Sequence, residues 1–284
     1  MRIILIISAV VFLTACAGTG KKAAITADEL IKITGELASD RFAGRGTGTG
    51  GDSLAALYIK REFQKAGVEP FGESGLQTFA VNVAAEAGDR NRLSVDDKVY
   101  ATGIDFMPLA LTSNSSLDAP VAFCGYGLLP SGDTLHRDDF AGVDLSGKWA
   151  LILRGYPESD PDSKGYASLS TDRLKVLNAR EKGAAGVLLV SGEKWDAADN
   201  LDKPSRSESG AGIPVLHVKR NVAYDILKGS AQALTELEDK AAQAKRYAGF
   251  IAGTSVSAEA EVVKKEALTS NVVMMIRGES TPGE

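Results

Sequence analysis

The first side chains to consider for covalent chemistry are the cysteines and histidines, of which the chain has two each. Cys124 lies in the strand-like run 121–126, a pattern that favours a small buried side chain. A catalytic thiol needs a nearby base, and only His136 and His217 could supply one. We therefore do not expect cysteine catalysis.

Two glycine-rich stretches have the spacing of nucleotide-binding loops, but their surroundings argue against that chemistry. Residues 46–51 contain G-x-G-x-x-G after an expected helix, whereas a dinucleotide site needs a strand there. Residues 142–148 have the glycines and lysine of a P-loop, but Trp149 replaces the magnesium-binding hydroxyl and an expected strand follows. Both stretches are interpreted as turns. A hydrated turn is also preferred to a cation site for three carboxylates: Asp138, Asp139 and Asp144.

Hydrophobic periodicity predicts alternating helices and short strands. Thr26 and Glu29 form a capping box that begins a helix with one apolar face: Leu30, Ile31, Thr34, Leu37 and Ala38. A second helix is expected to begin after a cap at Gly51 or Asp52 and to end near Ala66. Another is expected over 222–228, after a cap at Asn221. Two more are expected over 172–182 and 231–245. The main expected strands are 79–83, 93–95, 99–100, 121–126, 149–153, 187–190, 215–218, 256–262 and a buried strand at 270–278.

The first residues have the pattern of an export signal. A positive residue precedes the apolar run 3–13, which is too short to span a bilayer stably. Leu13-Thr14-Ala15-Cys16 resembles the lipobox of bacterial lipoproteins. That resemblance implies a signal peptide over 1–15, a lipid on Cys16, a tether over 16–23 and a place in the cell envelope, with an alanine after the cysteine that is compatible with outer-membrane sorting. The alternative is an ordinary secretory signal in which Cys16 is incidental.

Composition excludes one class of partner. The net charge is −5, with basic and acidic residues interspersed. The sequence lacks a basic patch with interleaved aromatic residues, the pattern that would indicate nucleic-acid binding. If Cys16 is acylated, Cys124 has no partner for an intrachain disulfide.

Two successive motifs resemble a protease-associated (PA) domain, a non-catalytic module found in or beside peptidases. A polar turn over 138–148 leads into the apolar run 149–153. A helix and Gly-Ala turn over 175–186 then leads into the second run, 187–190. The resemblance implies a PA domain over about 112–252.

Three flanking segments resemble the N-terminal part of zinc aminopeptidases of metallopeptidase family twenty-eight: 37–50, 55–70 and the returning strand 270–278. Many members of that family carry an inserted PA domain. The implied fold is α/β, with a PA domain (a small β-barrel or sandwich flanked by helices) inserted in the start of an α/β zinc-peptidase domain. Its implied peptidase parts are residues 24–111 and 253–284.

The resemblance implies two zinc ions in the intact family, held by a His-x-Asp motif, a Glu-Glu pair, and a further Asp and His after the returning strand. The chain ends at Glu284 before such motifs, and it contains no Glu-Glu pair. Neither His136 nor His217 belongs to a His-x-Asp or His-Glu-x-x-His pair. We therefore expect no catalytic residue, no metal ligand and no bound zinc in this chain. A truncated or split gene or an incomplete assembly is favoured as the reason over a naturally shortened descendant.

Two arginines are candidate substrate contacts. Arg45 lies among glycines and could reach a substrate carboxylate or a carbonyl near the family's zinc site, although a structural role in the peptidase core is favoured. Arg173 precedes the Gly-Ala turn, near the place of a substrate-binding arginine in related carboxypeptidases, although a solvated helix start is favoured.

We therefore expect the chain to be the N-terminal part of a lipid-anchored zinc aminopeptidase that acts on peptides in the bacterial envelope. This chain alone is expected to be inactive. The alternative from another class is a stand-alone PA-domain lipoprotein that binds peptides or assembles with a partner.

Overall fold

A computed structural model describes residues 25–129, 137–158, 163–205, 208–228, 234–243 and 247–278. The chain forms two compact units: residues 1–79 with 269–284, and residues 80–268. The lipobox with Cys16, and also His136, lie outside the described residues. In the described part, no helix is long and apolar enough to cross a membrane.

The first unit joins two helices to a pair of very short strands. Helix α2 (Ala27–Leu37) begins with the expected capping box, in which the Thr26 hydroxyl accepts the Glu29 N–H. Helix α3 (Gly50–Lys65) begins after Thr49, whose hydroxyl accepts the Asp52 N–H, so the expected cap at Gly51 or Asp52 is wrong. Strand β1 (Glu69–Pro70) pairs with β12 (Met274–Met275) in antiparallel register.

The core of the first unit is small. Phe42 lies in the 3₁₀ segment η1 (Asp40–Arg45) and contacts the Tyr58 ring edge-on, with 5.8 Å between centroids. Gly51 is required beside it, because a Cβ there would lie 2.0 Å from the Phe42 carbonyl oxygen. The expected apolar face of α2 is not buried by the described residues, since Ile31 is 67% exposed.

The second unit contains an eight-stranded sheet in the order β4-β3-β10-β6-β7-β8-β9-β5. The four central strands β6, β7, β8 and β9 pair in parallel, and the outer pairings are antiparallel. The strands are β3 (Arg92–Val95), β4 (Lys98–Tyr100), β5 (Phe106–Pro108), β6 (Ser115–Phe123), β7 (Trp149–Leu153), β8 (Gly186–Val190), β9 (Val215–Val218) and β10 (Phe250–Ala260). A separate antiparallel pair joins β2 (Leu76–Ala87) to β11 (Val262–Val272).

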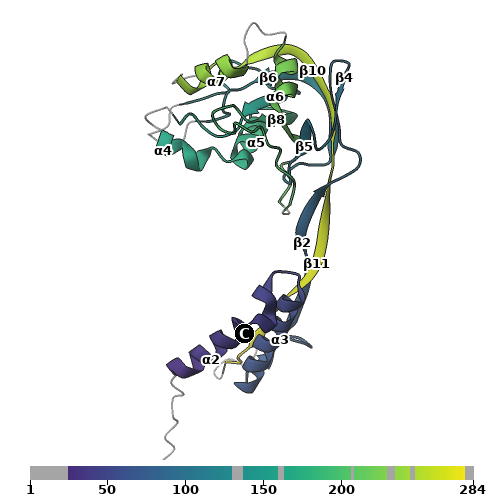
Figure 1. The fold of residues 1–284 in the computed structure, drawn as a ribbon. Coiled ribbons are helices and arrows are strands. Elements are labelled where there is room, and N and C mark those ends of the chain that lie inside the picture. The colour runs from purple at the N-terminus through teal and green to yellow at the C-terminus, as the bar shows by residue number, and fades with distance from the viewer. Residues whose placement is uncertain are drawn as a thin grey trace, which may run out of the picture. The chain divides into compact units, whose positions relative to one another are not determined.

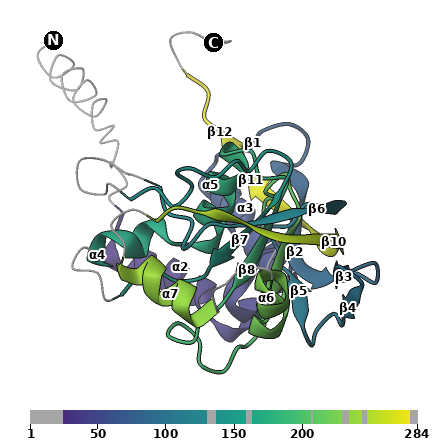
Figure 2. The same ribbon diagram turned by 90° about the horizontal axis from the view of Figure 1, so that it is seen from above.

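Helices cover both faces of the parallel strands, which explains why β7, β8 and β9 are continuous apolar runs. Helix α5 (Asp172–Glu181) packs on the face that carries Ile152 and Leu189, while α6 (Arg220–Leu227) and α7 (Leu234–Gln243) pack on the face of Leu151 and Leu188 (Figures 1 and 2). The short helix α4 (Ser163–Tyr166) and the 3₁₀ turn η2 (Ala167–Leu169) precede α5. The strands expected at 149–153, 187–190 and 215–218 are confirmed.

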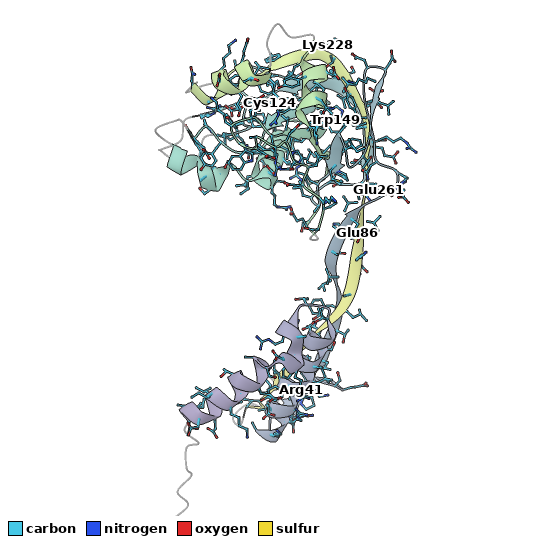
Figure 3. The ribbon with its side chains drawn as sticks, in the orientation of Figure 1. Arg41, Glu86, Cys124, Trp149, Lys228 and Glu261 are labelled. Carbon is cyan, nitrogen blue, oxygen red and sulfur yellow. The ribbon has the colours of Figure 1, made fainter. Side chains whose placement is uncertain are left out.

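Trp149 fixes the start of β7 within this sheet. Its side chain is fully buried, and its indole N–H donates to the Val256 carbonyl at 2.9 Å. The polar turn over 142–148 therefore leads into a strand, as predicted, and not into a phosphate-binding helix. Cys124 is also fully buried in this unit, as expected (Figure 3).

Two further local expectations are wrong. Helix α6 begins at Arg220 after the N-cap Lys219, while the Asn221 side chain donates to the Asp105 carboxylate at 2.8 Å. The expected buried strand at 270–278 is divided between the end of β11 and β12, and Ile276 is 84% exposed.

Candidate functional site at the carboxyl ends of the parallel strands

The parallel strands bring several polar side chains to one edge of the sheet. Arg154 directly follows β7, Ser191 directly follows β8, and His217 lies in the second half of β9. In open α/β sheets, ligands bind outside the carboxyl ends of parallel strands. This edge is therefore the candidate functional region of the second unit.

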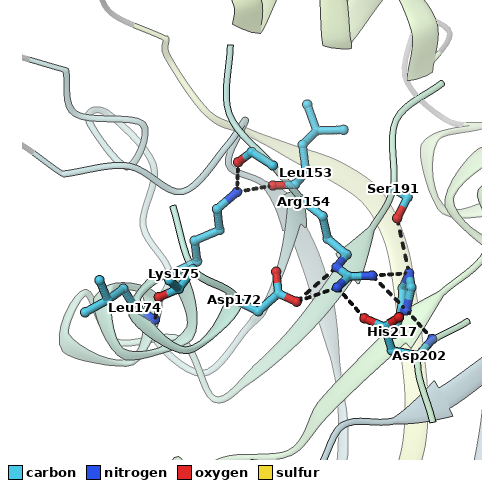
Figure 4. Close-up of polar contacts among 10 residues, drawn as sticks. Leu153, Arg154, Asp172, Leu174, Lys175, Ser191, Asp202 and His217 are labelled. Atoms are coloured by element: carbon cyan, nitrogen blue, oxygen red, sulfur yellow. Dashed lines mark hydrogen bonds and ion pairs between the residues drawn. The ribbon is translucent and has the colours of Figure 1, made fainter. Parts of the chain in front are cut away.

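Arg154 is the centre of the polar network (Figure 4). Its guanidinium contacts the Asp172 carboxylate at 2.8 Å and also pairs with Asp202. Asp172 is the first residue of α5, and Asp202 lies in the loop between β8 and β9. The Arg154 side chain is only 14% exposed, so the two carboxylates offset the cost of taking its charge out of water.

His217 is fully buried beside Arg154. Its Nδ1 accepts the Asp202 backbone N–H at 3.2 Å, which leaves the ring proton on Nε2, 3.4 Å from the Ser191 hydroxyl. Burial, and then the Arg154 guanidinium, lower the pKa of His217 to about 4. The imidazole is therefore neutral at pH 7, with both ring nitrogens engaged.

Lys175 carries a second buried charge, on the inner face of α5. Its ammonium donates to the carbonyls of Leu153 at 2.6 Å and Gly155 at 2.5 Å (Figure 4). Burial lowers the pKa of Lys175 to about 7. Lys175 was not among the site residues predicted from the sequence, although its position four residues before the buried Ala179 places it on the core face of the helix.

A hollow of about 480 Å³ lies beside this network, within the roughly 300–1,000 Å³ range of ligand sites. The start of α5 and two loops line it: Leu109–Leu111, Thr171–Arg173, Asp202–Ser205 and Glu208. Arg173 is in this lining, and its guanidinium donates to the Ser209 carbonyl at 2.8 Å. Its expected role as a substrate contact stays a prediction.

Arg45 lies in the first unit. It adopts a left-handed backbone conformation with φ 55°, and its guanidinium donates to the carbonyl of Leu37, the last residue of α2. Such a contact satisfies a helix C-terminal carbonyl, as a structural role would require. A contact with substrate stays a prediction for this residue also.

The three acidic residues considered for a hydrated turn differ from one another. Asp139 is fully buried and forms an ion pair with the buried Arg137 at 2.6 Å, so the expectation of hydration is wrong for it. Asp138 accepts the Phe140 N–H at 2.9 Å. Asp144 accepts the Ser146 N–H at 2.9 Å and pairs with Lys148. These contacts stabilise the turn before β7.

The described residues do not fit a zinc centre. Nowhere among them do three or more His, Cys, Asp or Glu side chains gather as metal ligands. His217, the one described histidine, faces a guanidinium and uses both nitrogens within the network. No catalytic step through zinc is therefore derived for this chain.

Comparison with known proteins finds a family match within the second unit. Residues 110–226 match the family model of the PA domain, which confirms the expected α/β chain with a PA domain. No curated protein sequence matches the chain.

Among solved structures, an aminopeptidase from Aneurinibacillus sp. strain AM-1 is similar, with 16% identity over 88% of this chain and 50% of that chain and a TM-score of 0.45. BSAP, a zinc aminopeptidase from Bacillus subtilis, shares 18% identity over 91% of this chain and 48% of its own, with a TM-score of 0.36. The chain thus spans about half the length of these two proteins.

Proposed function

We propose that the chain is the N-terminal part of a lipid-anchored, zinc-dependent aminopeptidase of the bacterial envelope, inactive as this chain alone. The observation that carries the proposal is that a PA domain, matched over 110–226, lies between the two stretches of chain that form the first unit. Residues before 80 and after 268 come together there, as they do when one domain is inserted in another. These flanking stretches contain the aminopeptidase-like motifs of the sequence.

The surface of the first unit supports an incomplete domain. Large apolar side chains of α2 and α3 are exposed, with Leu30 at 53%, Leu57 at 52% and Phe63 at 43%. Exposed apolar side chains that gather on helices mark surfaces made to be covered. In the proposal, the zinc-binding remainder of the peptidase domain covers these helices and supplies the two metal ions.

The PA domain would shape access of peptides to that zinc site. The hollow beside Arg173 offers a guanidinium for a peptide carbonyl or carboxylate, next to apolar side chains of Leu109 and Leu111. The buried Arg154 network behind it holds the start of α5, and hence Arg173, in place.

The test compares this chain with the protein encoded by the genomic reading frame continued past codon 284. We expect the longer protein to release p-nitroaniline from leucine p-nitroanilide, to contain zinc and to lose activity with a chelator, and the present chain to be inactive with added zinc. Activity of the present chain would contradict the proposal. So would a stop at codon 284 followed by unrelated sequence, which would favour the stand-alone PA-domain lipoprotein, for which the hollow is the peptide site.

The lipid anchor is tested separately. We expect the wild-type protein to incorporate radiolabelled palmitate and to sediment with membranes, because several acyl chains bind a bilayer stably. Replacement of Cys16 by serine should abolish the labelling and move most of the protein to the soluble fraction. Equal labelling of the two proteins would contradict lipidation at Cys16.

A further inference from the structure

A second, smaller pocket lies in the unit that contains the PA domain, and it is independent of the hollow beside Arg173. Its volume is about 240 Å³, below the range for drug-sized ligands, so it suits a single side chain or a small amine. Its lining includes Tyr126, Tyr156 and Trp195, which follow β6, β7 and β8 respectively. The pocket therefore lies at the carboxyl ends of the parallel strands, where ligands bind in such sheets.

Two aromatic rings form one wall of the pocket. Tyr156 and Trp195 lie with ring centroids 6.0 Å apart and planes inclined by 58°. Trp195 is 46% exposed, yet its indole rests on the backbone of Gly155, where a Cβ would come within 2.3 Å of the ring. A large aromatic side chain that is both exposed and held in place offers its face to a ligand.

A buried carboxylate forms another part of the lining. Glu238 of α7 is 2% exposed, and it accepts the Glu193 backbone N–H at 3.1 Å. The loop fits closely around this carboxylate, because a Cβ on Gly192 would lie 2.1 Å from its oxygen. The site is thus built around Glu238.

Glu238 forms no ion pair with another described residue, although the charge of Lys194 acts on it from a distance. Lys194 also lines the pocket, but its ammonium pairs with Asp239 at the surface, where the lysine side chain is 61% exposed. Glu158 adds a second carboxylate to the lining. Burial raises the pKa of Glu238, and the backbone N–H groups of Glu193 and Lys194 and the Lys194 charge offset only part of that effect.

We propose that the pocket formed by Tyr156, Trp195 and Glu238 binds an organic cation, an ammonium or guanidinium group at the end of a short carbon chain. The faces of tyrosine and tryptophan attract such a cation, and a carboxylate shielded from water attracts it more strongly than an exposed one does. The cation can come from a lysine or arginine side chain or from the amino terminus of a peptide.

The test is calorimetric titration of the purified full chain with four small probes. N-acetyl-lysine amide and N-acetyl-arginine amide present side-chain cations, leucine amide presents an α-ammonium, and N-acetyl-norleucine amide is the neutral control. We expect saturable binding of at least one cationic probe and at least tenfold weaker binding of the norleucine derivative. The probe that binds best identifies the source of the cation. Absence of binding by every cationic probe, or equal binding of the neutral one, would overturn the proposal.

Variants assign the binding to this pocket. Glu238→Gln keeps the shape and the backbone hydrogen bond, and it should weaken cation binding at least tenfold. Glu236→Gln, on an exposed position of the same helix, should leave it unchanged. Trp195→Ala provides a second test, because the exposed indole can be removed without opening the core. Unchanged affinity in both Glu238→Gln and Trp195→Ala would place the binding elsewhere. No outcome depends on peptidase activity, so this proposal and the proposed function can fail separately.

Discussion

The free energy of unfolding of the PA-domain unit is expected to rise between about pH 7 and about pH 8.5, and Lys175→Met should remove most of that rise. Burial lowers the pKa of Lys175 from 10.5 in the unfolded chain to about 7 in the folded one. Between these values the unfolded state binds more protons, so stability increases with pH, and below both values the slope vanishes. At about 1.4 kcal/mol per pH unit, the increase amounts to about 2 kcal/mol.

Other charged side chains near Lys175 also affect its pKa. Asp172 and Asp139 favour its charged form, whereas Arg154 and Arg137 oppose it. The arginines and carboxylates do not titrate between about pH 7 and about pH 8.5, so the slope in this range belongs to the lysine. At higher pH Cys124 opposes the rise, because burial raises the pKa of its thiol in the folded chain while the thiol of the unfolded chain loses its proton. The variant also leaves the Leu153 and Gly155 carbonyls without the ammonium donor, which lowers stability about equally at each pH.

The measurement is urea unfolding of the full chain at three pH values, followed by tryptophan fluorescence. Both tryptophans, Trp149 and Trp195, belong to the second unit and report on it. Lys182→Met is the matched control, because that lysine caps the same helix with its side chain 42% exposed. A slope that persists in Lys175→Met and disappears in the control would show that Lys175 is not the responsible group.

Local sequence signals predicted the framework of the second unit well. The strands at 149–153 and 187–190 are apolar over their whole length because helices cover both faces of the sheet, and such runs are visible without the structure. The resemblance to a PA domain rested on these strands and the turns that precede them, and the family match over 110–226 confirms it. The capping box at Thr26 was predictable for the same reason, since its hydrogen bonds join residues three apart.

The residues at the candidate functional edge of the sheet could not be predicted from such local signals. Tyr156, Trp195 and Glu238 lie far apart in the sequence, and only the parallel order of the strands and the position of α7 bring them together. The Arg154 network is assembled similarly from residues after β7, at the start of α5 and in β9. The prediction of a buried strand at 270–278 was wrong, because a continuous apolar run does not reveal which element would cover it.

Arg154→Met is expected to destabilise the PA-domain unit by about 3 kcal/mol at pH 7. This value is the lower end of the range, roughly 3–5 kcal/mol, for removing one partner of a buried ion pair. The variant leaves the Asp172 carboxylate, whose side chain is 23% exposed, without its cation. Asp202 is 54% exposed and remains hydrated, which limits the loss. Arg154→Lys should restore only part of the stability, since an ammonium cannot bridge two carboxylates as a guanidinium does.

A second measurement separates this network from a general loss of packing. The Arg154 guanidinium is one of the causes that hold the pKa of His217 at about 4, although burial is the larger one. In Arg154→Met that pKa should rise, because Asp172 and Asp202 remain beside the ring without the opposing cation. Titration of the His217 ring protons by NMR measures the change in the full chain.

Asp202→Asn is the matched variant for the same titration. Removing this carboxylate leaves Arg154 in place, so the pKa of His217 should fall further, while stability changes by less than about 1 kcal/mol. Movement of the pKa in opposite directions in the two variants is the result that the geometry requires. An unchanged pKa in Arg154→Met would mean that the guanidinium does not act on His217, and that the two side chains are neighbours without electrostatic coupling.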